Sequence, residues 1–424
     1  MSETLADRRV RLMGPNVPTF YDDPVHIVRG EGVWLWDADG RKYLDCYNNV
    51  PHVGHCHPHV VEAVAQQSSV LTTHTRYHHT LILDLMDRIT GSLSHGLDQM
   101  ILTCTGSEAN DIALRMAQAV TGKWGVIATD NTYHGNTLAT AQLSTRRPPI
   151  GGYPAHVRLV PAPSSLDPLG ASLSAQPEAF AGHIRDAIAD LDKAGIGFGA
   201  MMICPVFANE GLPALEPGFF APAEAVISNA GGLILCDEVQ PGFGRVGSHM
   251  WGHDWLGIAP DVVTLGKPMG NGYPVAGVVA QPAVMRAFRE AFGYFNTFGG
   301  NPVACAAAMA MLDVLESERL QDNALRVGHY ALEHLRALDH PAIAEVRGLG
   351  LFFGLEFSRP DGSPDSTFAH QVTEAMRQRG VLLNRIGRHM NTLKMRPPLP
   401  FATSHVDIAI MTLSDVLAEI PFDP

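Results

Sequence analysis

Residues 262–279, VVTLGKPMGNGYPVAGVV, decide the fold class of this chain. The stretch begins with a continuous apolar, β-branched run, which is typical of a strand buried on both faces of a sheet. The run ends at Lys267, directly before a turn rich in proline and glycine. Burial disfavours the charged form of a lysine, and the neutral amine is a nucleophile toward carbonyl groups. The pattern therefore predicts a reactive lysine, and a buried salt bridge is the alternative.

Similar apolar runs recur between about residues 100 and 300, separated by longer amphipathic segments. This alternation predicts a large α/β domain in which helices cover a mixed, mostly parallel sheet. A smaller α+β domain is expected after it, joined by the N-terminal segment. The predicted units are residues 1–65 (N-terminal segment joining the small domain), 66–310 (large domain) and 311–424 (small domain).

Composition excludes several classes of function. The formal net charge is −13 without basic runs, which argues against binding to nucleic acid or to anionic membranes. No apolar stretch approaches the roughly 20 residues of a membrane helix, and the N-terminus lacks the apolar core of a signal peptide. We therefore expect a cytoplasmic protein. The six cysteines form no CxxC pair, so buried free thiols are expected.

Ligands of open α/β sheets bind outside the carboxyl ends of the strands, so the residues that end each apolar run are informative. After the run at 100–104, Thr105, Gly106 and Ser107 open a helix. The free N–H groups and positive dipole end of such a helix can hold a phosphate, and glycine allows close approach. An ordinary serine N-cap is the alternative.

Two further run ends carry chemistry. Asp237 ends the run at 232–237, where a carboxylate is costly unless it is paired or hydrogen-bonded. An ion pair within the fold would also explain it. Tyr133 and His134 follow the run at 124–130, and the tyrosine could stack on a flat ligand or belong to the core. A phosphate cup, an acid, an aromatic ring and a reactive lysine together suit pyridoxal phosphate, whose ring acts as an electron sink.

Motifs along the chain resemble the class III aminotransferases, a fold-type I pyridoxal-phosphate family. The resemblance runs from about residue 25 to the C-terminus. It rests on TGSEAND (105–111), YHG (133–135), LCDEVQPGFGR (235–245), TLGKPMGNGYPVAG (264–277) and NTFGGNPVACAAAMAML (296–312).

The resemblance implies two catalytic residues, with Lys267 forming a Schiff base with pyridoxal phosphate and Asp237 pairing with the pyridine nitrogen. Gln240 would approach the 3′-oxygen of the cofactor. Thr297 would reach the cofactor phosphate of a neighbouring subunit, which implies a homodimer with shared active sites. The implied cofactor-binding residues are Gly106, Ser107, Tyr133, His134, Asp237, Val239, Gln240, Lys267 and Thr297.

Two departures bear on the substrate. Ordinary family members that bind an amino-acid carboxylate carry a pattern like LRxxPPL, whereas this chain has LKMRPPL, with Lys394 at the arginine position and Arg396 two residues later. Lysine lacks the planar fork that grips a carboxylate but binds phosphate well. Residues 43–60, YLDCYNNVPHVGHCHPHV, are similar to the phospho-lyase branch of the family, which acts on phosphoethanolamine and phosphohydroxylysine.

Both departures predict elimination from a small primary amine that resembles phosphoethanolamine or an aminophosphonate. Candidate substrate-binding residues are Tyr47, Asn49, Arg76, Lys394 and Arg396. The alternative is an ω-amine or amino-acid transaminase that uses a keto acid. It is favoured by Glu210 in FANEGL, near the position of a switching glutamate in some ω-amine transaminases.

Two other classes of function fit less well. The His52, His55, Cys56, His57 and His59 group has the ligand types of a zinc site, but its spacing fits no tetrahedral template, so no metal is predicted. A regulator or scaffold that only binds the cofactor would have no reason to retain both Lys267 and Asp237.

Overall fold

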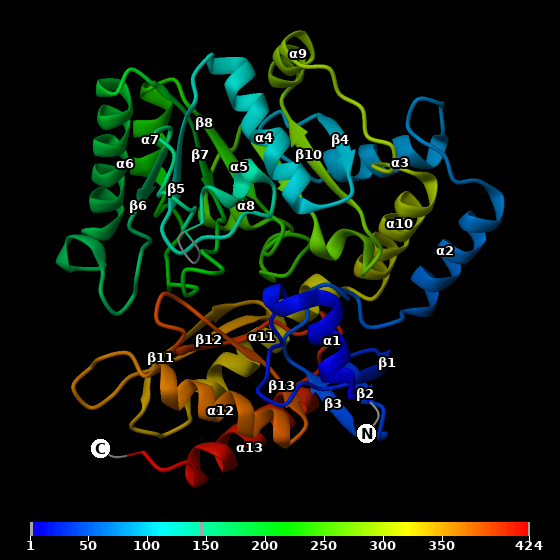
Figure 1. Cartoon of the computed structure of the whole chain (residues 1–424), viewed down its shortest axis with the longest axis vertical. Coiled ribbons are helices and arrows are strands. Elements are labelled where there is room, and N and C mark those ends of the chain that lie inside the picture. Colours follow the sequence, from blue (N-terminus) through cyan, green and yellow to red (C-terminus); the bar gives the residue numbers. More distant parts are fainter. Residues whose placement is uncertain (1–2, 145–147, 423–424) are drawn as a thin grey trace.

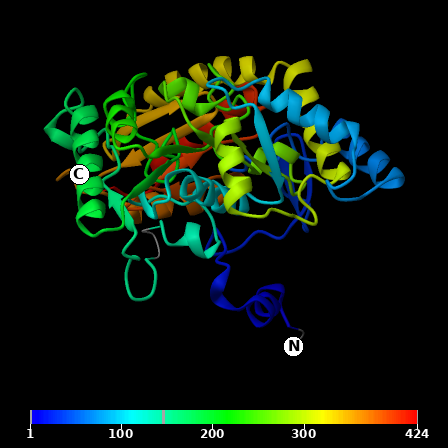
Figure 2. The same ribbon diagram turned by 90° about the horizontal axis from the view of Figure 1, so that it is seen from above.

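The computed structural model describes residues 3–144 and 148–422. A large domain lies above a smaller one in Figure 1. The N-terminal helix α1 (Leu5–Met13) has no buried residue and projects from the body of the molecule in Figure 2. Within the described residues, no helix is long and apolar enough to cross a membrane.

A seven-stranded sheet forms the large domain, in the order β4-β10-β9-β8-β7-β5-β6. β10 runs antiparallel to both of its neighbours, and the strands from β9 to β6 are parallel to one another. The predicted mixed, mostly parallel sheet is therefore confirmed. The strands are β4 (Gln99–Thr103), β5 (Gly125–Thr129), β6 (Val157–Val160), β7 (Phe198–Ile203), β8 (Leu233–Asp237), β9 (Val262–Leu265) and β10 (Ala276–Ala280).

Helices cover both faces of this sheet, which explains why its strands are apolar throughout. Leu233 and Leu235 of β8 pack into the core under α4. Ile234 and Cys236, which alternate with them, belong to the core that includes α6 and α7. The helices of the large domain are α2 (Pro58–Val70), α3 (Thr80–Thr90), α4 (Gly106–Thr121), α5 (Leu138–Ala141), α6 (Gln176–Lys193), α7 (Ala221–Asn229), α8 (Gly252–Leu256), α9 (Pro282–Ala291) and α10 (Pro302–Ser317), of which α2 packs on α10.

The smaller domain contains two four-stranded sheets, ordered β1-β2-β3-β13 and β11-β12-β15-β14. β3, in the N-terminal part of the chain, pairs in parallel with β13, in the C-terminal part, so segments far apart in the sequence share one sheet. The strands are β1 (Ile27–Glu31), β2 (Trp34–Asp37), β3 (Lys42–Asp45), β11 (Ile343–Leu349), β12 (Phe352–Phe357), β13 (Val381–Leu382), β14 (Asn384–Ile386) and β15 (Thr392–Met395). The helices are α11 (Leu320–Arg336), α12 (Ser366–Gln378) and α13 (Thr403–Glu419).

The cysteines are free thiols, as expected, but not all are buried. Cys56 is exposed, because it lies in the turn before α2, and Cys104 is only half-buried.

Candidate active site

A cavity of about 100 Å³ lies at the carboxyl ends of the large-domain strands. Its lining contains every predicted cofactor-binding residue except Thr297, and it adds Asn110, Gly135 and Cys204. The strand ends therefore meet at one place, as the topology of an open α/β sheet requires.

The start of α4 forms one wall of this cavity. Thr105 is the N-cap, since its hydroxyl accepts from the Glu108 N–H at 3.1 Å and Glu108 Oε2 accepts from the Thr105 N–H at 3.0 Å. The serine N-cap alternative is thus wrong, and Ser107 Oγ accepts from the Asn136 N–H at 3.0 Å instead. A Cβ on Gly106 would lie 2.9 Å from Val239 Cγ2, so only glycine fits between the helix and the loop after β8. Gly106 and Ser107 place the positive end of α4 at the wall of the cavity, where it favours an anion.

Asp237, the last residue of β8, is held by three donors. Its Oδ2 accepts from His134 Nδ1 at 2.7 Å and from Asn110 Nδ2 at 2.9 Å, and its Oδ1 accepts from the Val239 N–H at 3.0 Å. Burial alone would raise the pKa of Asp237, but the hydrogen bond and charge of His134 outweigh burial and keep that pKa below its ordinary value. The carboxylate is therefore held ionised in a buried place.

Lys267 lies two residues beyond the end of β9 and begins a short 3₁₀ turn, Lys267–Gly270. Its φ of 22° is rare for a residue with a side chain, and such strain is concentrated at functional sites. Burial, followed by the charge of Arg396, lowers the pKa of Lys267 to about 8. A neutral, nucleophilic amine is accordingly accessible near neutral pH.

Two further residues of the quoted motifs, Tyr133 and Glu238, have distinct environments. Tyr133 is 39% exposed, which rules out the core alternative, and its hydroxyl donates to Asn136 Oδ1 at 3.0 Å. Glu238 is buried away from this cavity, where it accepts from the backbone N–H groups of Gly252 and His253 at the start of α8. The acidic pair of the motif therefore faces two different parts of the molecule.

Sequence reasoning assigned no role to Asn110 or Cys204, although both line the cavity. Asn110 lies four residues after Gly106 on the same face of α4, a spacing that could have indicated it. Cys204 directly follows β7, so the rule that ligands bind at strand ends applies to it as well.

Arg396 lies just after β15 and contacts both Tyr47, another predicted substrate residue, and Gln240, a predicted cofactor residue. Its Nε donates to the Tyr47 carbonyl oxygen at 3.1 Å, and its guanidinium lies 4.6 Å from the centre of the Tyr47 ring. Its Nη1 donates to Gln240 Oε1, and Gln240 lines the cavity. Tyr47 and Arg396 thus meet next to Gln240.

Lys394, on β15, is only 1% exposed. Its ammonium donates to the Ala208 carbonyl oxygen at 2.8 Å and to Gln240 Oε1 at 3.1 Å. Burial, and then the charges of Arg396 and Lys267, lower its pKa well below the ordinary value. Lys394 therefore contacts other groups of the protein and does not line the cavity.

Three predicted residues are not part of this arrangement. Asn49 is buried, and neither polar atom of its amide has a hydrogen-bond partner among the described residues. Arg76 and Thr297 are exposed. The Arg76 guanidinium lies 4.0 Å from the centre of the Phe295 ring, so Arg76 and Thr297 belong to one surface region.

A second arginine supports the segment after Arg396. Arg245 is fully buried and donates to the carbonyl oxygens of Leu351 and Pro397 at 2.9 and 2.8 Å, and to His52 Nδ1 at 3.3 Å. Burial and the charge of Arg396 lower the pKa of Arg245 to about 9. The loop after β8 is in this way tied to the strand segment that carries Arg396.

The histidines of the motif at residues 43–60 contact separate partners. His55 pairs with Asp45 at 2.7 Å, and the His52 Nε2–H group donates to the Phe243 carbonyl oxygen at 2.7 Å. His57 pairs with Glu318, the residue directly after α10, and His59 pairs with Asp313 of α10. Each histidine therefore has its own partner.

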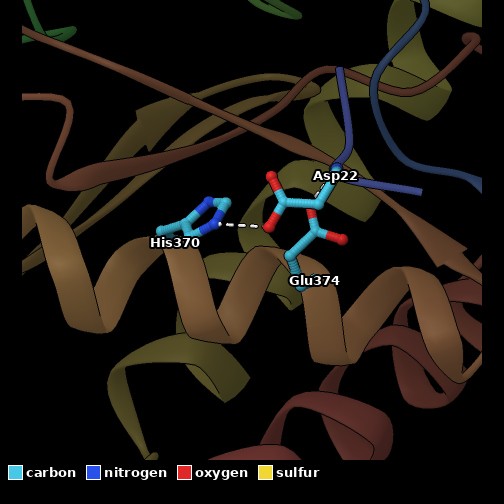
Figure 3. Close-up of side chains that lie close together, drawn as sticks. All are labelled: Asp22, His370 and Glu374. Atoms are coloured by element: carbon cyan, nitrogen blue, oxygen red, sulfur yellow. Dashed lines mark hydrogen bonds and ion pairs between the residues drawn. The ribbon is translucent and has the colours of Figure 1, made fainter. Parts of the chain in front are cut away.

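Outside the cavity, Asp22, His370 and Glu374 form a cluster whose ligand atoms lie within 4.8 Å of one another (Figure 3). His370 Nε2 lies 2.9 Å from Asp22 Oδ2, and the Asp22 N–H donates to Glu374 Oε1 at 3.1 Å. Two arginines also approach the cluster. Arg377 Nε lies 3.5 Å from Glu374 Oε2, and Arg385 Nη2 lies 3.0 Å from His370 Nδ1. Two arginines beside the cluster disfavour a cation, so these contacts act as a tether from the N-terminal segment to α12.

Comparisons with known proteins agree with this geometry. The Aminotransferase class-III family matches residues 18–417. Alanine–glyoxylate aminotransferase 2-like of Drosophila melanogaster is 37% identical, over 99% of this chain and 87% of its own length. Ethanolamine-phosphate phospho-lyase homolog 1 of Caenorhabditis elegans is 35% identical, over 98% and 93%. A phospholyase structure from Arthrobacter in complex with phosphoethanolamine is 39% identical, with a TM-score of 0.94 over 99% of this chain and all of that one.

The fold and the strand-end site define an enzyme of the fold-type I pyridoxal-phosphate class. More narrowly, the chain belongs to the class III aminotransferase family.

Proposed function

We propose that this enzyme uses pyridoxal phosphate to eliminate phosphate from a small phosphorylated primary amine such as phosphoethanolamine. One observation carries the proposal: Arg396 and Arg245 are at most 9% exposed, yet within the described residues their hydrogen bonds go to neutral acceptors. Buried cations without carboxylate partners are costly. A dianionic phosphate group next to Arg396 would supply the missing negative charge.

The large-domain residues fit the proposed cofactor. The start of α4, where a side chain at Gly106 would clash with Val239, and the Ser107 hydroxyl suit its phosphate. Asp237, held ionised by His134, suits a protonated pyridine nitrogen. Pyridoxal phosphate, when bound, supplies a carbonyl that links to amines and a ring that withdraws electrons from the adjacent carbon.

Lys267 and Asp237 then divide the proton chemistry. Lys267, released by the incoming amine, removes a proton from the carbon that bears the nitrogen, and its lowered pKa suits a general base. Asp237 keeps the ring nitrogen protonated throughout. The bond between the adjacent carbon and the phosphate oxygen would break, and the phosphate would leave with the electron pair. The carbon that loses the phosphate would take up a proton, such as the one held by Lys267, and addition of water would then yield an aldehyde and ammonia.

Arg396 suits the departing phosphate. Of its five N–H groups, Nε–H donates to Tyr47 and one on Nη1 to Gln240, which leaves others for an anion. The guanidinium also lies 4.6 Å from the centre of the Tyr47 ring, and this cation–π contact helps to fix its position. Charge-assisted bonds from a fixed guanidinium would stabilise negative charge as it builds on the leaving group.

The proposal includes a homodimer with shared sites. Exposed Tyr77, Phe295 and Phe298 accompany Arg76 and Thr297 on the same surface region. An exposed apolar group of this kind is typical of a subunit contact. In a dimer, Arg76 and Thr297 of one subunit would complete the site of the other. Cytoplasmic location stays a prediction from the sequence.

Transamination is the second candidate, because several similar proteins have aminotransferase names and Glu210 is present. Glu210 accepts from Thr129 Oγ1 at 2.7 Å, and the Asn209 N–H donates to its other oxygen at 3.0 Å. Lys394 donates to Ala208 and Gln240. A bidentate arginine clamp for the carboxylate of a keto acid is thus absent at position 394, which favours elimination.

The test is to mix the holoenzyme with O-phosphoethanolamine, without a keto acid, and to measure released phosphate and acetaldehyde. Release over many turnovers in equal amounts supports elimination. Ethanolamine, which lacks the phosphate, is the matched control and should give no acetaldehyde. If the visible absorbance of the cofactor instead disappears with amines and returns with pyruvate, the enzyme is a transaminase and the proposal is wrong.

A further inference from the structure

Two basic side chains contact the same amide oxygen, that of Gln240. Gln240 Oε1 accepts from Lys394 Nζ at 3.1 Å and from Arg396 Nη1. A guanidinium has no acceptor, so the oxygen of the amide must face it, and its two lone pairs are then both used. The nitrogen of Gln240 must face elsewhere, and it donates to Asn209 Oδ1 at a long 3.4 Å.

Lys394 is fixed independently of Gln240. Its ammonium also donates to the Ala208 carbonyl oxygen at 2.8 Å and lies 5.1 Å from the centre of the Phe352 ring. The side chain is 1% exposed, so it has little freedom to follow a substrate. A compact amine head with rotatable donors can donate to oxygens on two different loops at once.

Arg396 is less suited to hold Gln240 during turnover. Under the proposed function it also binds the substrate phosphate, and a charge-assisted bond to phosphate is stronger than one to a neutral amide. Lys394 would then remain as the donor to Gln240 Oε1.

We infer that Lys394 is a positioning residue: it holds the Gln240 amide so that its N–H group faces the phenolic oxygen of the bound cofactor. This inference rests on the proposed cofactor, and the proposed substrate enters only in the argument that sets Lys394 above Arg396. It assigns to the lysine of LKMRPPL a role in cofactor chemistry instead of substrate recognition.

The experiment is a pH titration of the visible absorbance of the holoenzyme without any substrate. A hydrogen bond donated to an ionised oxygen favours its ionised form, so losing it should raise the midpoint of the titration. We expect Gln240→Leu to raise the midpoint by about one pH unit and Lys394→Met by about half a unit, since Arg396 still contacts the amide. Lys193→Met, at an exposed lysine on α6, should leave the midpoint unchanged.

The double variant separates positioning from a direct effect of charge. If Lys394 acts through Gln240, adding Lys394→Met to Gln240→Leu should shift the midpoint no further. An equal shift of Lys394→Met in both backgrounds would show a direct field effect and overturn the inference, as would no shift at all. If Lys394→Met does not fold, an unchanged midpoint in Gln240→Leu overturns the inference and the expected rise supports it. Failure of phosphate release alone would leave this titration unaffected and reject only the proposed substrate.

Discussion

The cofactor side and the phosphate side of the candidate site are assembled from different kinds of structure. Ser107, Tyr133, Asp237 and Lys267 each follow or end a strand of one sheet. Arg396 instead belongs to the smaller domain and reaches the site through contacts with residues far away in the chain. The first side is a property of one sheet, and the second depends on how two domains pack.

This difference predicts different sensitivities. On the cofactor side, each group is held by the strand that carries it and by local hydrogen bonds, such as those to Asp237. On the phosphate side, Arg396 depends on the Arg396 N–H to Cys46 bond at 2.8 Å and on Arg245, which binds the Pro397 carbonyl. Changes on the first side should affect chemistry, and changes on the second should affect substrate binding.

The largest effect should come from Lys267→Ala. It removes both the amine that links to the cofactor and the general base, so turnover should fall by at least about 10³-fold. Phosphate release from phosphoethanolamine measures this, and mass spectrometry after borohydride reduction should find no covalently attached cofactor. Activity near the wild-type level would remove the central assignment.

Asp237→Asn should have the next largest effect. The amide keeps the shape of the side chain but not the charge that holds the ring nitrogen protonated, so kcat should fall by about 10²-fold. Its buried partners Asn110 and His134 would lose an ionised acceptor, and we also expect weaker cofactor retention in equilibrium dialysis. Normal kcat in this variant would mean that the electron sink depends on another group.

The cofactor side could be predicted from the sequence because strand periodicity and strand ends are local properties. Asp237 and Lys267 end apolar runs that are buried on both faces, and such runs are readable without knowledge of packing. Even so, Asn110 was missed, since its contact with Asp237 requires the placement of α4 against β8.

For the phosphate side, the sequence indicated which residues take part but not how they are arranged. The contact between Tyr47 and Arg396 joins positions 349 residues apart, and no periodicity encodes it. For Lys394, the sequence indicated a substrate ligand, whereas its burial and its contact with Ala208 appear only once β15 is packed against the large domain.

On the phosphate side, Arg396→Lys should raise the KM for phosphoethanolamine by about tenfold with a smaller change in kcat. Lysine keeps the charge but loses the planar fork and the stacking on Tyr47. Arg388→Lys is the matched control, because the Arg388 side chain, which pairs with Asp130, is 66% exposed and its exchange should change KM by less than about twofold. A drop in kcat with constant KM would show that Arg396 acts in the chemical step and not in substrate binding.

The lowered pKa of Lys267 gives a smaller, pH-dependent effect. Only the neutral amine reacts, so the rate at which apoenzyme takes up pyridoxal phosphate should rise through a pKa of about 8 and then level off. Between pH 8 and 10 we expect a gain of about twofold, whereas a lysine with an ordinary pKa near 10.4 would gain well over tenfold. Stopped-flow absorbance measures the rate, and a continued steep rise to pH 10 would contradict the lowered pKa.

The smallest effect should come from Asp22→Asn, at the tether between the N-terminal segment and α12 (Figure 3). The side chain of Asp22 is 73% exposed, and exposed ion pairs contribute less than about 1 kcal/mol. Thermal unfolding should therefore change by only a few degrees, and EDTA should not lower the midpoint of the wild type. Arg377 and Arg385 already supply positive charge beside Glu374 and His370, so a metal ion there would add a third cation to a site of two carboxylates. If EDTA destabilised the wild type but not Asp22→Asn, the cluster would be a metal site, and the smaller domain would carry a ligand of its own.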